Sequence, residues 1–188
     1  TYLLAIDYLK RAGLVPQEDA KVIGAGGAQA MIAAVENRQI DMGCFASPVV
    51  ELAVSRGKSD WFINNATGVD PMFGEFLFEL LYVRPDYAEE NPEIVRNVVK
   101  SLVAANEWIV AASDEDHLSV LKPRFEAVDD AVLLEAIGNV KAAIRPDGCV
   151  TPASVEAAVG FLQRVDMLQS SIPFEAVADN SFLPGSCD

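Results

Sequence analysis

The residues of this chain that could do chemistry are gathered between Lys21 and Pro48, where two predicted helices begin directly after two predicted strands. The first helix follows the glycine turn 24–27, and the second follows Ser47. Backbone N–H groups at a helix start lack intrahelical partners and carry partial positive charge, so they suit carboxylate, sulfonate or phosphate groups. This stretch therefore predicts a binding edge for an anionic or polar molecule, without catalytic residues.

The elements that would position these groups follow from the hydrophobic pattern. Residues 21–25 and 40–45 are short apolar runs typical of strands, whereas a helical pattern starts at Ala28. Ser47 is predicted to cap the second helix with its hydroxyl, and Pro48 to occupy its first position. Because the carboxyl ends of successive parallel strands meet at one sheet edge, both helix starts would face the same ligand.

We expect the ligand to contact these strand ends and helix starts, together with two polar residues that follow the next predicted strand, 61–64. The predicted ligand-binding residues are Gly26, Gly27, Ala28, Gln29, Phe45, Ser47, Asn65 and Thr67. Each also has a purely structural interpretation. The glycines would permit a tight turn, Phe45 would pack in a core, and Asn65 and Thr67 would form a plain turn.

Composition excludes several classes of function. The net charge is −14, from 28 acidic and 14 basic residues, and no cluster of three basic residues occurs, so nucleic acid is excluded as a partner. No apolar run approaches the roughly 20 residues of a membrane span, so direct membrane insertion is not expected. No signal-peptide pattern is present in this numbering.

The cysteines and the single histidine predict no metal site and no cofactor. Cys44, Cys149 and Cys187 lack the close spacing of zinc ligands. Cys44 is predicted to be a small core residue, and His117 to lie on the surface. Whether Cys149 and Cys187 form a disulfide is left open by the sequence.

In the first third of the chain the predicted strands and helices alternate. The predicted elements after it are almost all helices. Helices are predicted over 2–12, 47–56, 91–113 and 114–122, and from Asp129 and Thr151, with a buried strand over 76–83. A helical layer of this kind needs a sheet to cover. We therefore expect the missing strands in a segment that precedes Thr1.

Several short motifs resemble the second lobe of solute-binding proteins of the nitrate/sulfonate/taurine and thiamine-precursor type, which serve ABC importers. The resemblance rests on the segments Leu9–Leu14, Gly24–Gly27, Asn37–Asp41, Ala46–Pro48 and Asp179–Pro184. It extends over nearly the whole chain, although each motif is short.

The resemblance implies an α/β, type II periplasmic-binding-protein-like fold, with two lobes joined by hinge strands and the first lobe incomplete. Residues 1–75 would form lobe two, and residues 76–188 the hinge strand and the helical return to lobe one. Roughly a hundred residues of lobe one would precede Thr1. The implied partners are a small-molecule ligand and a membrane permease, and the implied location is periplasmic or extracytoplasmic.

Two other classes of protein remain open at this point. The effector-binding domain of a LysR-type transcription regulator has a similar two-lobed fold and would follow a DNA-binding helix-turn-helix. A pyrimidine-precursor-synthase-like enzyme would use a pyridoxal cofactor, with Cys44 at the position of that family's cysteine-rich strand. Ligand identity is open among sulfonates, nitrate, aromatic acids, pyrimidines and riboflavin-like molecules.

Overall fold

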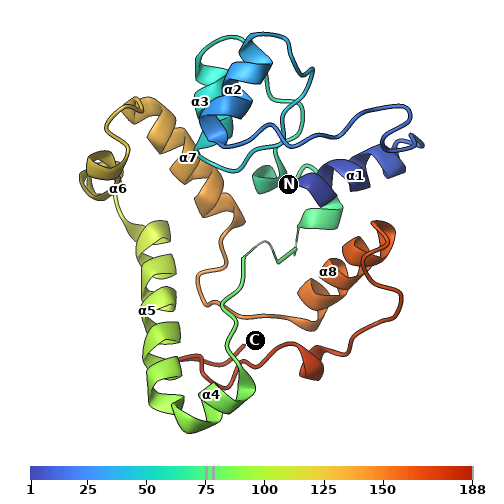
Figure 1. The fold of residues 1–188 in the computed structure, drawn as a ribbon. Coiled ribbons are helices and arrows are strands. Elements are labelled where there is room, and N and C mark those ends of the chain that lie inside the picture. Colours follow the sequence, from blue (N-terminus) through green and yellow to red (C-terminus); the bar gives the residue numbers. More distant parts are fainter. Residues whose placement is uncertain (75, 78, 188) are drawn as a thin grey trace. The chain divides into compact units, whose positions relative to one another are not determined.

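The computed structural model describes residues 1–74, 76–77 and 79–187, and this part of the chain is mostly helical (Figure 1). The α-helices are α1 (Tyr2–Arg11), α2 (Ala28–Glu36), α3 (Val49–Ser55), α4 (Pro85–Glu90), α5 (Pro92–Ala111), α6 (Asp114–Leu121), α7 (Asp130–Ala143) and α8 (Pro152–Arg164). Four 3₁₀ helices are η1 (Asn65–Thr67), η2 (Pro71–Phe73), η3 (Lys122–Arg124) and η4 (Phe174–Ala176). Within the described ranges, no helix is both long and apolar enough to cross a membrane.

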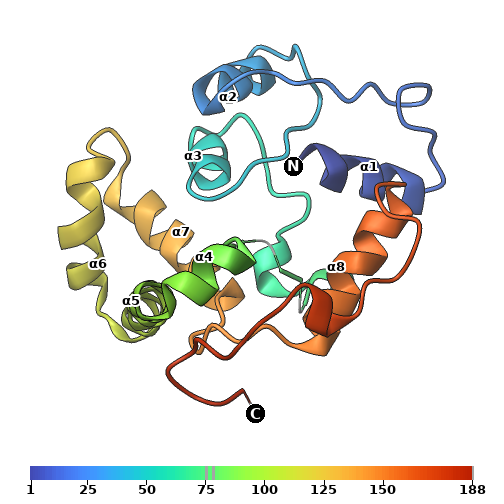
Figure 2. The same ribbon diagram turned by 60° about the horizontal axis from the view of Figure 1, so that its bottom comes forward.

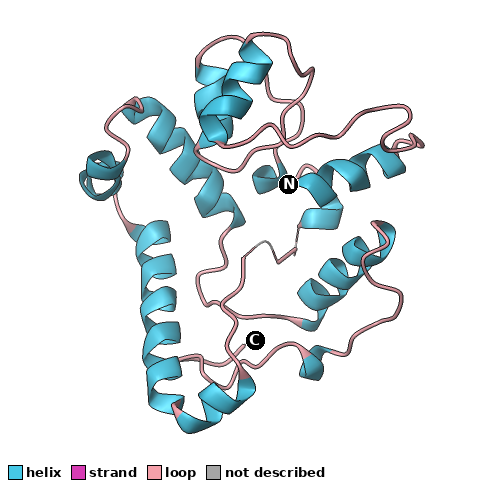
Figure 3. Cartoon of the chain, in the orientation of Figure 1, coloured by secondary structure: helices cyan, strands magenta, loops and turns pink. Residues whose placement is uncertain are grey.

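The predicted α/β fold of the type II periplasmic-binding class is wrong. Helix accounts for 54% of the structure and strand for 1%, and the described residues form no sheet. The described residues contain one isolated β-bridge, between Pro16 and Ala20. Figure 3 shows loops at the predicted strands 21–25, 40–45 and 61–64. The predicted strand 76–83 is likewise loop where it is described; positions 75 and 78 lie outside the described residues.

The failure of the strand predictions has a physical cause. A strand is held by hydrogen bonds to a neighbouring strand, and an apolar run on its own supplies none. Several apolar side chains of these runs consequently lie exposed, and the other described ones are half-buried. Ile23 is 62% exposed, Phe62 84% and Tyr82 92%. Apolar composition was therefore misread as evidence for a buried strand.

The predicted helices formed, and the end of α1 and the start of α8 lie where the capping residues place them. Gly13 has φ of 76°, its N–H donates to the Lys10 carbonyl, and the Leu14 N–H donates to the Leu9 carbonyl, which closes α1 as a Schellman motif. At the start of α8, the Thr151 hydroxyl accepts from the Ser154 N–H and the Ser154 hydroxyl accepts from the Thr151 N–H.

Two compact units divide the chain, and each is formed by two separate stretches of sequence. Unit 1 contains residues 1–64 and 114–140, and unit 2 contains residues 65–113 and 141–188. The predicted division near residue 75 follows the sequence resemblance and stays a prediction.

Unit 1 contains α1, α2, α3, α6, η3 and most of α7. Helices α2 and α3 contact each other in both views of the ribbon (Figures 1 and 2), and an ion pair of 3.2 Å joins Arg56, behind α3, to Glu36 at the end of α2. The buried apolar side chains of this unit include Ile32 and Leu133, which are 0% and 2% exposed.

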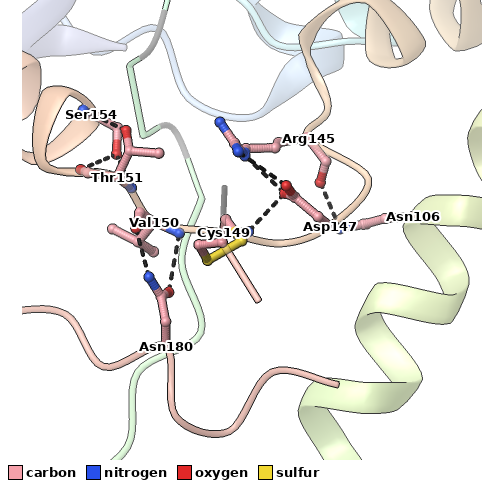
Figure 4. A network of polar contacts seen from close by, with 9 residues as sticks. Asn106, Arg145, Asp147, Cys149, Val150, Thr151, Ser154 and Asn180 are labelled. Carbon is pink, nitrogen blue, oxygen red and sulfur yellow. Dashed lines mark hydrogen bonds and ion pairs between the residues drawn. A yellow bond between two sulfur atoms is a disulfide. The ribbon is translucent and has the colours of Figure 1, made fainter. Parts of the chain in front are cut away.

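Unit 2 contains α4, α5, α8 and the chain's last segment. Phe73, Phe76 and Phe161 form an aromatic cluster with edge-to-face contacts, whose ring centroids lie 5.1 to 6.0 Å apart. Helix α5 buries Val95 and Val103. The last segment is held to the residues before α8 by side-chain contacts (Figure 4), because the Asn180 amide bonds both backbone groups of Val150.

A disulfide between Cys149 and Cys187 fixes the end of the chain within unit 2. The loop before it is ordered by Asp147, which accepts two hydrogen bonds from the Arg145 guanidinium and one from the Cys149 N–H (Figure 4). The Arg145 hydrogen bond is the largest cause that lowers the pKa of Asp147. The pairing that the sequence left open is thus present in the structure.

We expect Cys187→Ser to lower the free energy of unfolding in non-reducing buffer. The bond closes a sequence separation of 38 residues, for which the chain-entropy relation gives about 4 kcal/mol. Urea denaturation of both proteins measures the difference. In the presence of dithiothreitol the two curves should coincide, and a difference of the same size in reducing buffer would contradict the role of the disulfide.

Candidate functional site

A small cavity in unit 1 is lined by one polar and otherwise apolar side chains. Its volume is about 130 Å³, and its lining residues are Ser47, Pro48, Leu121, Phe125, Leu133, Ala136, Ile137 and Val140. The four residues on α7 lie at positions i, i+3, i+4 and i+7, which places them on one face of that helix. The remaining residues come from the entry to α3, the end of α6 and the turn that follows η3.

A buried carboxylate lies directly behind the polar wall of this cavity. The Ser47 hydroxyl donates to Glu51 Oε1 at 2.7 Å, and Asn139 Nδ2 donates to the same oxygen at 2.7 Å. Asn64 Nδ2 in turn donates to Asn139 Oδ1 at 2.9 Å. These hydrogen bonds connect α3, α7 and the loop before η1 within unit 1.

Glu51 is at the centre of this hydrogen-bond network, and its side chain is 0% exposed. Burial of a carboxylate is costly unless hydrogen bonds replace the lost water. Its position in the first turn of α3 also favours negative charge, since that end of a helix carries partial positive charge. Its second oxygen, Oε2, accepts no hydrogen bond from the described residues. The carboxylate therefore retains unused acceptor capacity.

The predicted role of Ser47 as a helix cap differs from what is observed. Helix α3 begins at Val49, its N-cap is Pro48, and no side chain caps it. The hydroxyl of Ser47 donates to Glu51 instead. A capping hydroxyl accepts from a backbone N–H, whereas the orientation of this hydroxyl is set by its donation to the carboxylate four residues further along. Ser47 is nevertheless the predicted ligand residue that lines the cavity.

The glycine turn lies outside the cavity lining. Gly26 has φ of 89°, a backbone conformation that favours glycine, and Gly27 is the N-cap of α2. Ala28 and Gln29 are the first two residues of that helix, and the side chain of Gln29 is exposed. These positions agree with the structural interpretation of a tight turn, and their ligand role stays a prediction.

The other predicted residues are placed elsewhere. The ring of Phe45 lies so close to Gly43 that a Cβ on that glycine would collide with it, and Phe45 does not line the cavity. Asn65 and Thr67 lie in η1, which belongs to unit 2. The structure therefore brings Ser47, but none of the other predicted residues, to this cavity.

Two residues that build the site were not singled out from the sequence, although each carries a signal. Glu51 is the one acidic residue in the run 48–54, and Asn139 follows an apolar stretch of α7 and lies beside Val140. A single polar residue within an apolar helical pattern requires a buried partner. This rule indicates that each residue has a buried partner. It does not show that the two residues contact each other, because they lie 88 positions apart in the sequence.

Cys44 and His117 complete the chemistry-bearing residues of unit 1. His117 is 0% exposed, so the predicted surface location is wrong; it lies on the inward face of a short helix, which its acidic neighbours concealed. Cys44 is a free, half-buried cysteine, and burial raises the pKa of its thiol. Among the described residues no group of three His, Cys, Asp or Glu side chains could hold a metal ion.

We expect Asn139→Ala to lower the free energy of unfolding by about 1–3 kcal/mol, because it removes a donor from a buried carboxylate. The matched control is Asn37→Ala, since the Asn37 amide donates to the Ala33 carbonyl at an exposed position. The control should change stability by less than about 0.5 kcal/mol. Equal effects of the two substitutions in urea denaturation would contradict the importance of the Glu51 network.

We also expect the Cys44 thiol to react slowly in the folded protein. A raised pKa lowers the thiolate fraction at a given pH, and the thiolate is the reactive form. Labelling with Ellman's reagent at pH 8 should be several times slower in buffer than in urea, with the disulfide intact in both. Equal rates in the two conditions would show an accessible, ordinary thiol.

Comparison of the chain with protein-family models, with curated proteins and with solved structures gave no match. The candidate site therefore rests on the residues and geometry described above. Its defining features are the Ser47 hydroxyl at the wall of a small apolar cavity and the buried Glu51 carboxylate behind it.

Proposed function

We propose that this protein binds a small polar organic molecule without catalysis, as the extracytoplasmic solute-binding component of an ABC importer. The observation that carries the binding function is the unit 1 cavity, with one serine among otherwise apolar lining residues. Ligand sites commonly combine an apolar lining with a few placed polar groups. The wall around Ser47 has this composition on a small scale.

The cavity limits the size of the ligand. Its volume of about 130 Å³ is close to that of an engineered protein cavity of about 150 Å³ that binds benzene. Drug-sized ligands occupy pockets of about 300–1,000 Å³. Within the range of ligands left open by the sequence, the cavity favours the smallest and disfavours a riboflavin-like molecule.

The transport part of the proposal is supported by two separate observations. The segments Leu9–Leu14, Asn37–Asp41 and Ala46–Pro48 resemble solute-binding proteins of ABC importers, and the third segment includes the cavity residues Ser47 and Pro48. The Cys149–Cys187 disulfide suits an oxidising compartment, where such bonds persist. The proposal does not depend on a two-lobed sheet fold.

The test is a thermal-shift screen of small organic molecules with the wild type and a cavity variant. A specific ligand raises the melting temperature, and the rise grows with the ratio of the ligand concentration to its dissociation constant. We expect Val140→Phe to abolish that rise, because the added ring occupies the cavity. The matched control is Val110→Phe at an exposed position of α5, which should leave the rise unchanged.

A second measurement addresses catalysis. After prolonged incubation with the protein, a ligand found in the screen should be recovered unchanged when it is analysed by mass spectrometry. Conversion of the ligand would contradict a purely binding function. The binding function itself is refuted if no molecule in a broad panel stabilises the wild type, or if Val140→Phe binds as well as Val110→Phe.

A further inference from the structure

We infer that the cavity of unit 1 selects a ligand whose polar end donates hydrogen bonds, most favourably an alkylammonium group, and rejects small carboxylates and sulfonates. This inference rests on the proposed binding function and names the chemical class of the ligand. It narrows the anionic or polar ligand that the sequence predicts.

The first step concerns the proton of Ser47. A serine hydroxyl has one hydrogen to donate and two lone pairs that accept. Its hydrogen is committed to Glu51 Oε1, at 2.7 Å. Ser47 lines the cavity, and toward any group other than Glu51 its oxygen can therefore only accept. A ligand that meets this oxygen must supply the hydrogen, which an amine or an alcohol does and a carboxylate does not.

The second step concerns the charge behind the hydroxyl. Glu51 is fully buried, and its Oε2 accepts no hydrogen bond from the described residues. A buried carboxylate acts through a low local dielectric, so a cation nearby is attracted and an anion repelled more strongly than in water. The Ser47 hydroxyl, polarised by its bond to Glu51, becomes a better acceptor for a charged donor.

The third step is that the cavity offers nothing to compensate an anion. None of its lining residues is basic. Of the three basic residues next to lining residues in the sequence, Lys122 bonds the Asp130 carboxylate at 2.8 Å, Lys141 donates to a backbone carbonyl at 3.3 Å, and Arg124 is exposed. The first turn of α3 already holds the Glu51 carboxylate. The net charge of −14 further favours the approach of cations.

The probes are three molecules with the same branched carbon skeleton and different polar ends: isopentylamine, isopentanol and isovalerate. Each is close in size to the roughly benzene-sized space of the cavity. We expect isopentylamine to bind about tenfold more tightly than isovalerate at pH 7, with isopentanol between them. Titration calorimetry and thermal shift at low ionic strength measure the three affinities with the wild type.

Variants test whether Ser47 and Glu51 cause the preference for the amine. Ser47→Ala removes the acceptor and should weaken isopentylamine about tenfold. The control Ser55→Ala alters an exposed serine that bonds the Leu52 carbonyl and should bind as the wild type does. Glu51→Gln keeps an acceptor for Ser47 but removes the charge. It should reduce the preference for amine over alcohol, even if Ser47→Ala proves unstable.

The outcomes separate this inference from the proposed function. An order of amine, alcohol and carboxylate that depends on Ser47 and Glu51 supports the inference. If isovalerate binds as tightly as isopentylamine, and Val140→Phe abolishes its binding, the inference is overturned while the binding function stands. If none of the probes binds and no molecule of the broad panel does, the binding function fails and the inference fails with it.

Discussion

The constraint on which the site depends is the burial of one carboxylate, Glu51. A charged group without water must be bonded by the protein, and this requirement brings together Ser47 before α3 and Asn139 on α7. The same requirement orients the Ser47 hydroxyl away from its capping role. The network that stabilises Glu51 thus uses the hydrogen of Ser47 and leaves the Ser47 oxygen as a hydrogen-bond acceptor.

The helices could be predicted from the sequence because their signals are local. Gly13 ends α1, and Thr151 with Ser154 begins α8, as capping chemistry within a few residues requires. The sheet could not be predicted in this way, because a strand depends on a partner that the sequence pattern does not show. The exposed apolar residues Phe62 and Tyr82 show that hydrophobicity alone does not create a strand.

The site was predictable only in part. The sequence indicates Ser47 because a serine before proline is typical of a helix start, although it does not show the partner of the hydroxyl. Glu51 was missed because an acidic residue in a first helical turn is ordinarily explained by the helix dipole. Asn139 lies 88 positions from Glu51, and only the fold brings the two together. The apolar face of α7 was recognisable by its helical spacing.

The anionic ligand expected from two helix starts is disfavoured by the same local chemistry. Helix α3 already carries the Glu51 carboxylate in its first turn, so the partial positive charge of that helix end is compensated by the protein itself. Helix α2 begins at the glycine turn and contributes no residue to the cavity. What remains at the cavity is an acceptor oxygen with negative charge behind it.

The most direct measurement is a crystal structure of the protein at a resolution that defines the Ser47 side chain. The account predicts Ser47 Oγ within hydrogen-bond distance of Glu51 Oε1, with Asn139 Nδ2 on the same oxygen. A Ser47 hydroxyl that instead accepts from the backbone N–H groups of α3, with Glu51 turned to solvent, would contradict it.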